Sequence, residues 1–233
     1  MKITIPLCTL ALALLAAAPG ARANDRPFQS ARTAVAEDDD QVWSIETWTQ
    51  RRGSVRGLSF EPEYVFTPKF SVQWELTRLV DREGAETGHE AEMELKYLFN
   101  RIDADGYGIA VSGTVAAERL RESGSTVKSL TLKLPVSIEL GQKQGYLHLN
   151  AGFTKANDSR PAWVRSMALE TELFRRTTGF VEIARDADER FVQVGVRHWI
   201  KREKFAIDFA LQRQGTGGPQ GYGFIFGLGL YDL

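Results

Sequence analysis

Carboxylates, basic side chains and one histidine recur at every second residue along several segments of the chain. Glu92 and Glu94 are an example. Because successive side chains of a strand point to opposite faces, residues two apart share one face of a sheet. The polar residues that we expect on one shared face are Glu75, Glu92, Glu94, Lys96, Lys133, Glu139, His148, Asn150, Glu170, Glu172, Arg197 and Asp208. The same parity adds Glu61, Glu63, Glu182 and Lys69. Acid exceeds base on this face, so a cavity lined by it would prefer cations.

Among the three histidines, His148 is the one that could serve as a general base or a ligand. No Ser or Asp partner is positioned by spacing, so a structural histidine is the simpler interpretation. His89 in a loop and His198 at an expected membrane interface are better explained as polar anchors. His148, Glu170 and Asp208 could converge on a metal, but their spacing is unspecific. We therefore predict no catalytic residue, no metal site and no cofactor.

The composition excludes several classes of protein. The chain has 233 residues, 43% of them hydrophobic, which is too many for a disordered chain. Its 29 basic and 30 acidic side chains leave no broad electrostatic footprint for nucleic acid. One cysteine cannot build a disulfide framework. Neither a glycine-rich phosphate loop nor a nucleophile-elbow motif is present.

In the same segments, hydrophobic residues occupy every second position and alternate with these polar residues. In residues 130–140 leucine, valine and isoleucine alternate with Ser, Thr, Lys and Glu, and in 222–230 aromatic and aliphatic residues alternate with glycines. This pattern is typical of strands with two different faces. It predicts about twelve strands, near residues 41–50, 57–66, 69–80, 89–99, 106–118, 127–140, 144–155, 163–174, 178–185, 190–200, 204–213 and 222–233. The first, eighth, ninth and tenth alternate poorly, and Pro135 inside a strand implies a bulge.

The connections between these segments alternate between tight and longer ones. Such alternation with an even strand number predicts an antiparallel transmembrane β-barrel of the outer membrane, with tight turns in the periplasm. Aromatic residues predict two interfacial belts. One, beside the tight turns, comprises Phe66, Phe70, Tyr97, Phe99, Tyr107, Trp199, Phe205 and Tyr231; the other comprises Trp48, Phe60, Phe153, Trp163, Phe191 and Tyr222. A soluble β-sandwich or ligand-binding barrel also alternates, but it would carry its large aliphatic residues inside.

The N-terminal region differs from the rest. Lys2, an apolar run from Leu7 to Ala18, and small residues at Ala21 and Ala23 predict a cleaved secretory signal peptide over residues 1–23. The one cysteine, Cys8, falls within it. We expect residues 24–40 to form a periplasmic N-terminal segment and residues 41–233 to form the barrel, exported to the outer membrane. The sequence leaves open whether residues 24–40 enter the lumen.

Several stretches resemble a known family. Arg26-Pro27-Phe28, the acidic run 37–40 and Trp43–Trp48 are similar to the start of the meta-pathway phenol-degradation channel family of outer-membrane proteins. Strand segments resemble that family at 94–99, 134–137, 147–153, 195–197 and 205–208. The resemblance implies a barrel of about twelve strands that admits hydrophobic or aromatic compounds. Residues 29–32 depart from the usual start of family members.

Three functional hypotheses follow. In the first, the barrel is a passive channel for small solutes with an acidic lumen, in which Glu92, Glu94, Glu170, Glu172 and Asp208 set the cation preference or bind polar groups. In the second, a closed barrel hydrolyses lipid with His148 as the base, and in the third the barrel is structural and plugged. Twelve strands lie between the eight that leave a packed interior and the sixteen that leave a channel, so an open and a plugged lumen both fit. The expected partners are outer-membrane lipid, a small-molecule solute and the barrel-assembly machinery.

Overall fold

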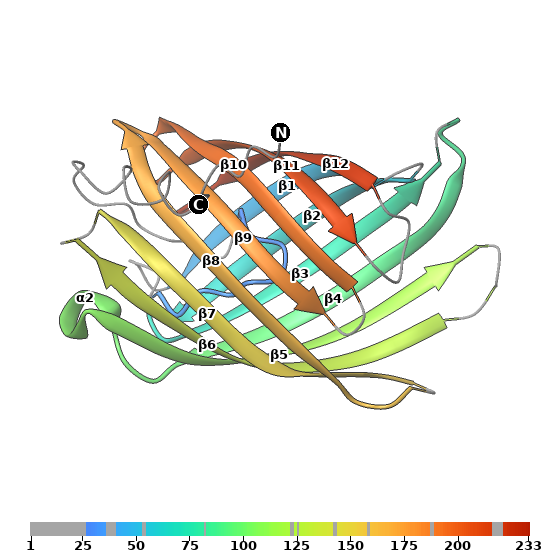
Figure 1. Cartoon of the computed structure of the whole chain (residues 1–233), viewed down its shortest axis with the longest axis horizontal. Coiled ribbons are helices and arrows are strands. Elements are labelled where there is room, and N and C mark those ends of the chain that lie inside the picture. Colours follow the sequence, from blue (N-terminus) through green and yellow to red (C-terminus); the bar gives the residue numbers. More distant parts are fainter. Residues whose placement is uncertain are drawn as a thin grey trace, which may run out of the picture.

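The structure, a computed structural model, describes residues 27–35, 41–52, 55–81, 83–121, 124, 126–141, 144–157, 159–186, 189–215 and 221–233. Twelve strands form one closed antiparallel barrel (Figure 1). They are β1 (Val42–Arg52), β2 (Val55–Thr67), β3 (Phe70–Val80), β4 (Glu86–Leu98), β5 (Tyr107–Leu120), β6 (Thr126–Leu140), β7 (Gly145–Ala156), β8 (Ala162–Phe174), β9 (Thr177–Asp186), β10 (Glu189–Lys201), β11 (Phe205–Gly215) and β12 (Gly221–Leu230). The predicted fold class and strand number are confirmed.

Each strand pairs with its sequence neighbours, and β1 closes the barrel against β12 from Ile45–Leu230 to Arg52–Gly223. Every strand therefore has a partner on both sides, and the described sheet has no free edge. None of the helices in the described residues is long and apolar enough to cross a membrane.

The hydrophobic side chains at alternate positions of the strands point outward from the barrel. Leu132 on β6 and Phe209 on β11 are 53% and 46% exposed, whereas Glu182 on β9 is fully buried. Hydrocarbon is the only solvent that favours a closed belt of exposed aliphatic and aromatic residues around polar contents. The alternative of a soluble barrel with an aliphatic centre is thereby excluded.

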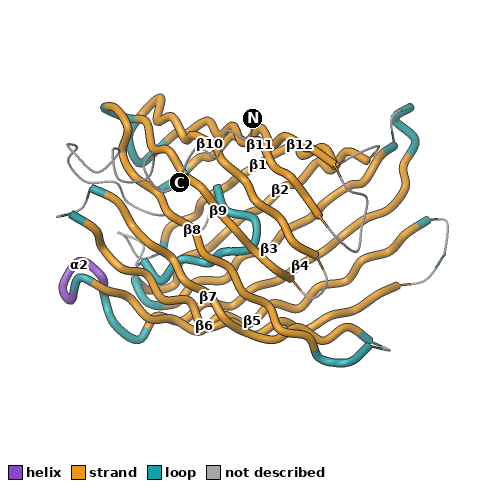
Figure 2. Tube along the Cα trace, in the orientation of Figure 1, coloured by secondary structure: helices purple, strands orange, loops and turns teal. Residues whose placement is uncertain are grey.

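The two ends of the barrel differ in their connections. Tight turns join β2 to β3, β8 to β9 and β10 to β11, with Arg176 and Glu203 in left-handed backbone conformations. At the same end the chain between β4 and β5 forms the short helix α2 (Ile102–Asp105), which ends at Gly106 with φ of 75°. We expected only a tight turn there. Figure 2 shows α2 at the same end of the barrel as the C-terminus, which follows β12.

The predicted aromatic belts are wrong at three residues. Trp48, Phe191 and Tyr231 are 5%, 8% and 6% exposed, and they point into the barrel rather than toward lipid. Trp48 and Phe191 lie on β1 and β10, two strands whose alternation is weak in the sequence. The remaining belt residues named above lie on the exposed side or at intermediate exposure.

The predicted bulge at Pro135 is also wrong. Ile109–Val136 and Ser112–Lys133 are paired on β5 and β6 in one continuous register, and only the intervening pairs are missing. Pro135 has no N–H to donate, so the ladder loses bonds locally while the strands stay aligned.

The N-terminal segment does not stay outside the barrel. Figures 1 and 2 show residues 27–35 as a loop inside the wall of strands, although we expected residues 24–40 to lie in the periplasm. Phe28, Ala31 and Ala34 are fully buried. We call Pro27–Val35 the lumen segment. The predicted signal peptide lies outside the described residues.

Candidate functional site: the occupied lumen

The lumen segment is anchored to the barrel wall by one carboxylate. The backbone N–H groups of Gln29, Ser30 and Ala31 donate to the Glu182 carboxylate at 2.8, 2.9 and 2.6 Å. The Gln193 amide on β10 donates to the same carboxylate at 2.6 Å and to the Pro27 carbonyl at 3.2 Å. Hydrogen bonds to an ionised acceptor are about twice as strong as neutral ones. Glu182 therefore replaces the water that these buried peptide groups would otherwise need.

Arg32 forms a second anchor. Its guanidinium Nε lies 2.6 Å from Glu94 Oε2, and Thr114 donates to the same oxygen at 2.8 Å. The Arg32 N–H donates to Asn150 Oδ1 at 2.9 Å, and Asn150 Nδ2 donates back to the Arg32 carbonyl at 3.0 Å. Asn150 thus pairs with both backbone groups of Arg32 as a residue of a neighbouring strand would, without extending the sheet.

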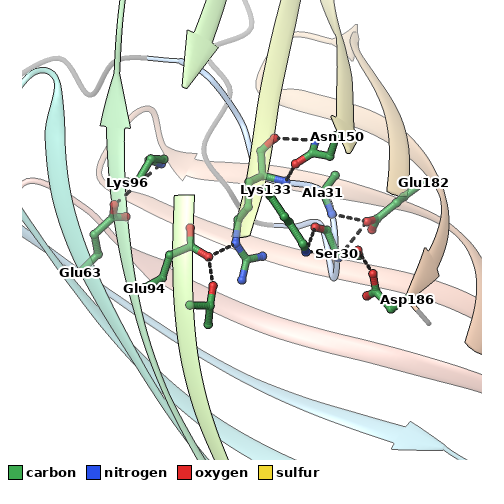
Figure 3. A network of polar contacts seen from close by, with 11 residues as sticks. Ser30, Ala31, Glu63, Glu94, Lys96, Lys133, Asn150, Glu182 and Asp186 are labelled. Atoms are coloured by element: carbon green, nitrogen blue, oxygen red, sulfur yellow. Dashed lines mark hydrogen bonds and ion pairs between the residues drawn. The ribbon is translucent and has the colours of Figure 1, made fainter. Parts of the chain in front are cut away.

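Ser30 is held from two further directions. The Lys133 ammonium donates to the Ser30 carbonyl at 2.8 Å, and the Ser30 hydroxyl donates to Asp186 at 3.1 Å. Figure 3 shows Lys133 of β6, Asn150 of β7, and Glu182 and Asp186 of β9 converging on the segment. These strands hold the segment together with β4, which carries Glu94.

The apolar side of the segment packs on a small hydrophobic cluster. The Phe28 ring meets Phe180 edge-on at 5.8 Å and lies 5.3 Å from the His148 ring. The cluster consists of Phe28, Ala31, Trp48, Ala168, Phe180, Ala210 and Ile225. Burying a Phe side chain contributes about 1.5–3 kcal/mol. Phe28 therefore adds a hydrophobic anchor to the polar ones.

At its other end the segment passes very close to the barrel wall. A Cβ added to Gly108 on β5 would lie 1.8 Å from the Ala34 carbonyl oxygen. Ala34 packs with Leu98 and Ala110, and Val35 packs with Ile102 and Tyr146. Only glycine permits this approach of two backbones.

Ser137, His148 and Glu170 form a hydrogen-bonded chain on β6, β7 and β8. Ser137 Oγ lies 2.8 Å from His148 Nδ1, and His148 Nε2 lies 3.4 Å from Glu170 Oε1. These are the residue types of a hydrolytic triad. However, Ser137 is fully buried, and its hydroxyl oxygen accepts the Ala34 N–H at 2.8 Å. The three hydrogen-bonded side chains therefore support the lumen segment, and they offer no exposed nucleophile.

Arg197 organises a separate cluster near the tight-turn end. Its guanidinium binds Asp208 in a bidentate pair at 2.7 and 2.8 Å and lies 3.4 Å from Glu46. Tyr231, just beyond β12, donates to Glu46. Burial, with the neighbouring carboxylates, raises the pKa of the Tyr231 phenol well above its usual range, so the phenol stays protonated. This cluster joins β1, β10, β11 and the C-terminal end across the closing seam.

The remaining predicted residues also face the lumen. Among the described contacts, Glu75 accepts from Thr77 at 2.9 Å, Lys96 lies 4.0 Å from Glu63, and Glu172 lies 3.7 Å from Arg202. Glu139 is half-buried. Glu92 lines a vestibule of about 200 Å³ on the long-loop side of the segment, together with Arg32, Lys133 and Asp186. A smaller cavity of about 20 Å³ lies beside Pro27, Glu46 and Phe180.

The structure does not gather the twelve predicted residues into one site. Glu94, Lys133 and Asn150 bind the lumen segment, Arg197 and Asp208 brace the seam, and His148 and Glu170 join Ser137. In the described residues, no group of three or more His, Cys, Asp or Glu side chains is placed to hold a metal ion. Asp208 pairs with Arg197 and does not join His148 and Glu170.

Sequence reasoning missed several residues of the site. Arg32, Ser137 and Gln193 carry contacts to or from the segment, and Glu46 belongs to the Arg197 cluster. The strand residues among them could have been noticed, because each occupies one of the alternate positions that face inward. Nothing in the pattern of a strand, however, shows which inward side chains meet a segment that has no periodicity of its own.

Comparison with known proteins reveals likeness in structure alone. No protein-family model and no curated protein sequence matches the chain. A KdgM porin structure superposes with a TM-score of 0.64 at 10% identity over 82% of this chain and 99% of that one. The likeness is one of fold, a closed antiparallel barrel like that of the KdgM porin. Omp33 of Acinetobacter baumannii gives 0.50 at 6% identity over 82% and 98% of the two chains. LpxR of Salmonella typhimurium gives 0.52 at 7% identity over 81% and 99%.

Proposed function

We propose that the protein is a passive channel of the outer membrane for small solutes, and that the lumen segment holds it closed. The observation that carries this proposal is how Pro27–Val35 is attached. Side chains of the wall bind its peptide groups, and no strand of the barrel pairs with it in a ladder. Such a segment can leave or shift without unpairing the barrel. The porin-like fold supports the proposal without deciding the solute.

The charge of the interior favours cations. The described buried bases are Arg32, Lys96 and Arg197, and the described buried carboxylates are Glu46, Glu61, Glu63, Glu94, Glu170, Glu172, Glu182 and Asp208. All three of those bases are already ion-paired with carboxylates of the wall. A pore lined by excess carboxylate concentrates cations and repels anions. One neighbouring structure is a KdgM porin in complex with disordered oligogalacturonate; a polyanion of that kind would be disfavoured in this lumen.

Apolar wall residues support neutral aromatic solutes as a second class of cargo. If the segment left the lumen, Trp48, Phe180 and Ile225 would lose the cover that Phe28 and Ala31 provide. An uncovered aromatic patch within a polar lumen would bind a solute that has one apolar face and a polar group. This agrees with the resemblance to the phenol-degradation channel family, which stays a prediction.

Planar-bilayer recordings test the channel. Glu92 lines the vestibule on the long-loop side of the segment. In a salt gradient, the full-length protein should show a reversal potential of cation-selective sign, and Glu92→Gln should reduce that potential. Absence of any conductance would refute the channel. An anion-selective potential would refute the role of the carboxylates.

A structural barrel with a permanently closed lumen is the second candidate. The many contacts to Pro27–Val35 favour it. The same recordings separate the two, because a permanently closed barrel stays silent at every voltage and solute concentration. We propose no enzymatic step for either candidate, given the burial of Ser137.

A further inference from the structure

Three arginines form a row across the outer surface near the long loops. Arg165 on β8 is the register partner of Arg185 on β9, and Arg185 is the partner of Arg190 on β10. All three have the outward parity of their strands, because the adjacent Ser166, Ala184 and Phe191 are buried. Three guanidinium groups thus project side by side from one face of the barrel toward its surroundings.

An aliphatic row lies directly beside the arginines, on the side of the membrane centre. Met167, Ile183 and Val192 are register partners of one another and are 46%, 49% and 46% exposed. Each lies two residues from its arginine, so the two rows share one face. Together the rows line an open groove of about 510 Å³ on the outside of the wall.

Neighbouring aromatic residues fix the depth of the arginine row. Trp163, two residues before Arg165 on the same face, is 64% exposed and lies 3.8 Å from the Phe153 ring. Tyr222 on β12 is 80% exposed and carries the Arg213 guanidinium over its ring at 5.9 Å. Exposed Trp and Tyr mark the interface between hydrocarbon and headgroups. The arginine row therefore stands at headgroup level on the long-loop side.

Arg165 and Arg190 flank Arg185 as its register partners, so three cationic groups stand side by side. Like charges directly opposite each other on neighbouring strands destabilise a sheet. Guanidinium groups bind phosphate in a bidentate manner and are less strongly hydrated than ammonium groups. A phosphate held by Arg165 and Arg190 would offset this repulsion, and a hydrocarbon chain attached to it would lie along Met167, Ile183 and Val192. Charge and apolar contact are both matched only when one molecule carries both groups.

We propose that this groove is a binding site for a phosphorylated lipid of the outer leaflet, with the phosphate on the arginine row and an acyl chain on the aliphatic row. The proposal is independent of conductance, since the groove faces lipid and not the lumen. It assigns the β8–β10 face of the barrel to a specific lipid and leaves the rest of the belt to bulk lipid.

Binding of diphosphoryl lipid A to the full-length protein in detergent, followed by native mass spectrometry, tests the proposal. The double variant Arg165→Gln with Arg190→Gln should lower the affinity at least tenfold. The matched control, Arg119→Gln with Lys128→Gln, removes two exposed outward cations at the same end of the barrel. It should change the affinity less than twofold. Arg165→Lys with Arg190→Lys keeps the charge without the bidentate geometry and should fall between.

Two further probes identify the source of the phosphate. Inorganic phosphate should compete only at concentrations at least a hundredfold higher, and phosphatidylethanolamine should bind less tightly than diphosphoryl lipid A. Equal loss in the row variant and the control would reduce the effect to net charge and overturn the site. Competition by inorganic phosphate at the same concentration as the lipid would overturn the role of the aliphatic row. A heat-dependent gel shift confirms that each variant is folded.

Discussion

Glu182 is the residue on which closure of the lumen depends most. One buried carboxylate accepts three successive N–H groups and the Gln193 amide. A glutamine there keeps the shape but loses the charge and presents one acceptor oxygen instead of two. A hydrogen bond to a charged group contributes about 1.5–3 kcal/mol, so Glu182→Gln should raise the population of the displaced segment by about tenfold or more.

Thiol labelling measures this population. Cys8 lies in the predicted signal peptide, so Ala31→Cys gives the mature chain a single thiol, buried while the segment is in place. Its labelling by a membrane-impermeant reagent should accelerate about tenfold in the Glu182→Gln background. Glu172→Gln removes another buried carboxylate of the wall, one paired with Arg202, and should leave the rate unchanged. If Ala31→Cys is labelled at the same rate with and without Glu182→Gln, Glu182 is not the anchor of the segment.

Ser137 distinguishes a structural from a catalytic role for the Ser137–His148–Glu170 chain. Ser137→Ala leaves the Ala34 N–H and His148 Nδ1 without their described partner. An unsatisfied buried polar group costs about 1–3 kcal/mol, so the variant should unfold at lower denaturant concentration. Neither the unaltered protein nor the variant should hydrolyse phospholipid in micelles. Turnover that disappears in Ser137→Ala would establish the enzyme instead.

At the scale of elements, the close approach of β5 to the lumen segment predicts a way to open the channel from the wall. Gly108→Ala places a methyl group where the Ala34 carbonyl now lies, so the segment must shift. Gly113→Ala on the same strand is the control, because its added Cβ meets only the flexible Leu132 side chain at 3.3 Å. Single-channel recordings should show more frequent openings in Gly108→Ala alone. Unchanged openings would mean that the Ala34 end does not hold the segment.

Strands could be predicted from the sequence to within about three residues, because lipid outside and polar contents inside impose opposite demands on alternate residues. The same logic placed Glu94, Lys133 and Asn150 on the inner face. It failed for Trp48 and Phe191, since an aromatic residue fits an interfacial belt as well as a buried place inside the barrel. Trp48 lies in the apolar cluster around Phe28. It could not place Pro27–Val35, whose contacts join residues between 62 and 166 positions apart.

For the whole molecule, the closing β1–β12 pair and the Arg197 cluster predict a barrel that resists unfolding in detergent and unfolds cooperatively. Unboiled protein should migrate differently from boiled protein on a detergent gel. Asp208→Asn weakens the bidentate pair beside the seam and should lower the temperature at which the folded band disappears. If the unboiled and boiled bands coincide, the closed barrel is wrong.

On the proposed function, Pro27–Val35 alone keeps the lumen from conducting. The most direct measurement compares planar-bilayer currents of the full-length protein with those of a variant whose residues 27–35 are replaced by a glycine-serine linker of equal length. The full-length protein should show rare, brief openings, and the linker variant should show a steady cation-selective current. A silent linker variant, or an equally large steady current in both proteins, would contradict the proposed function.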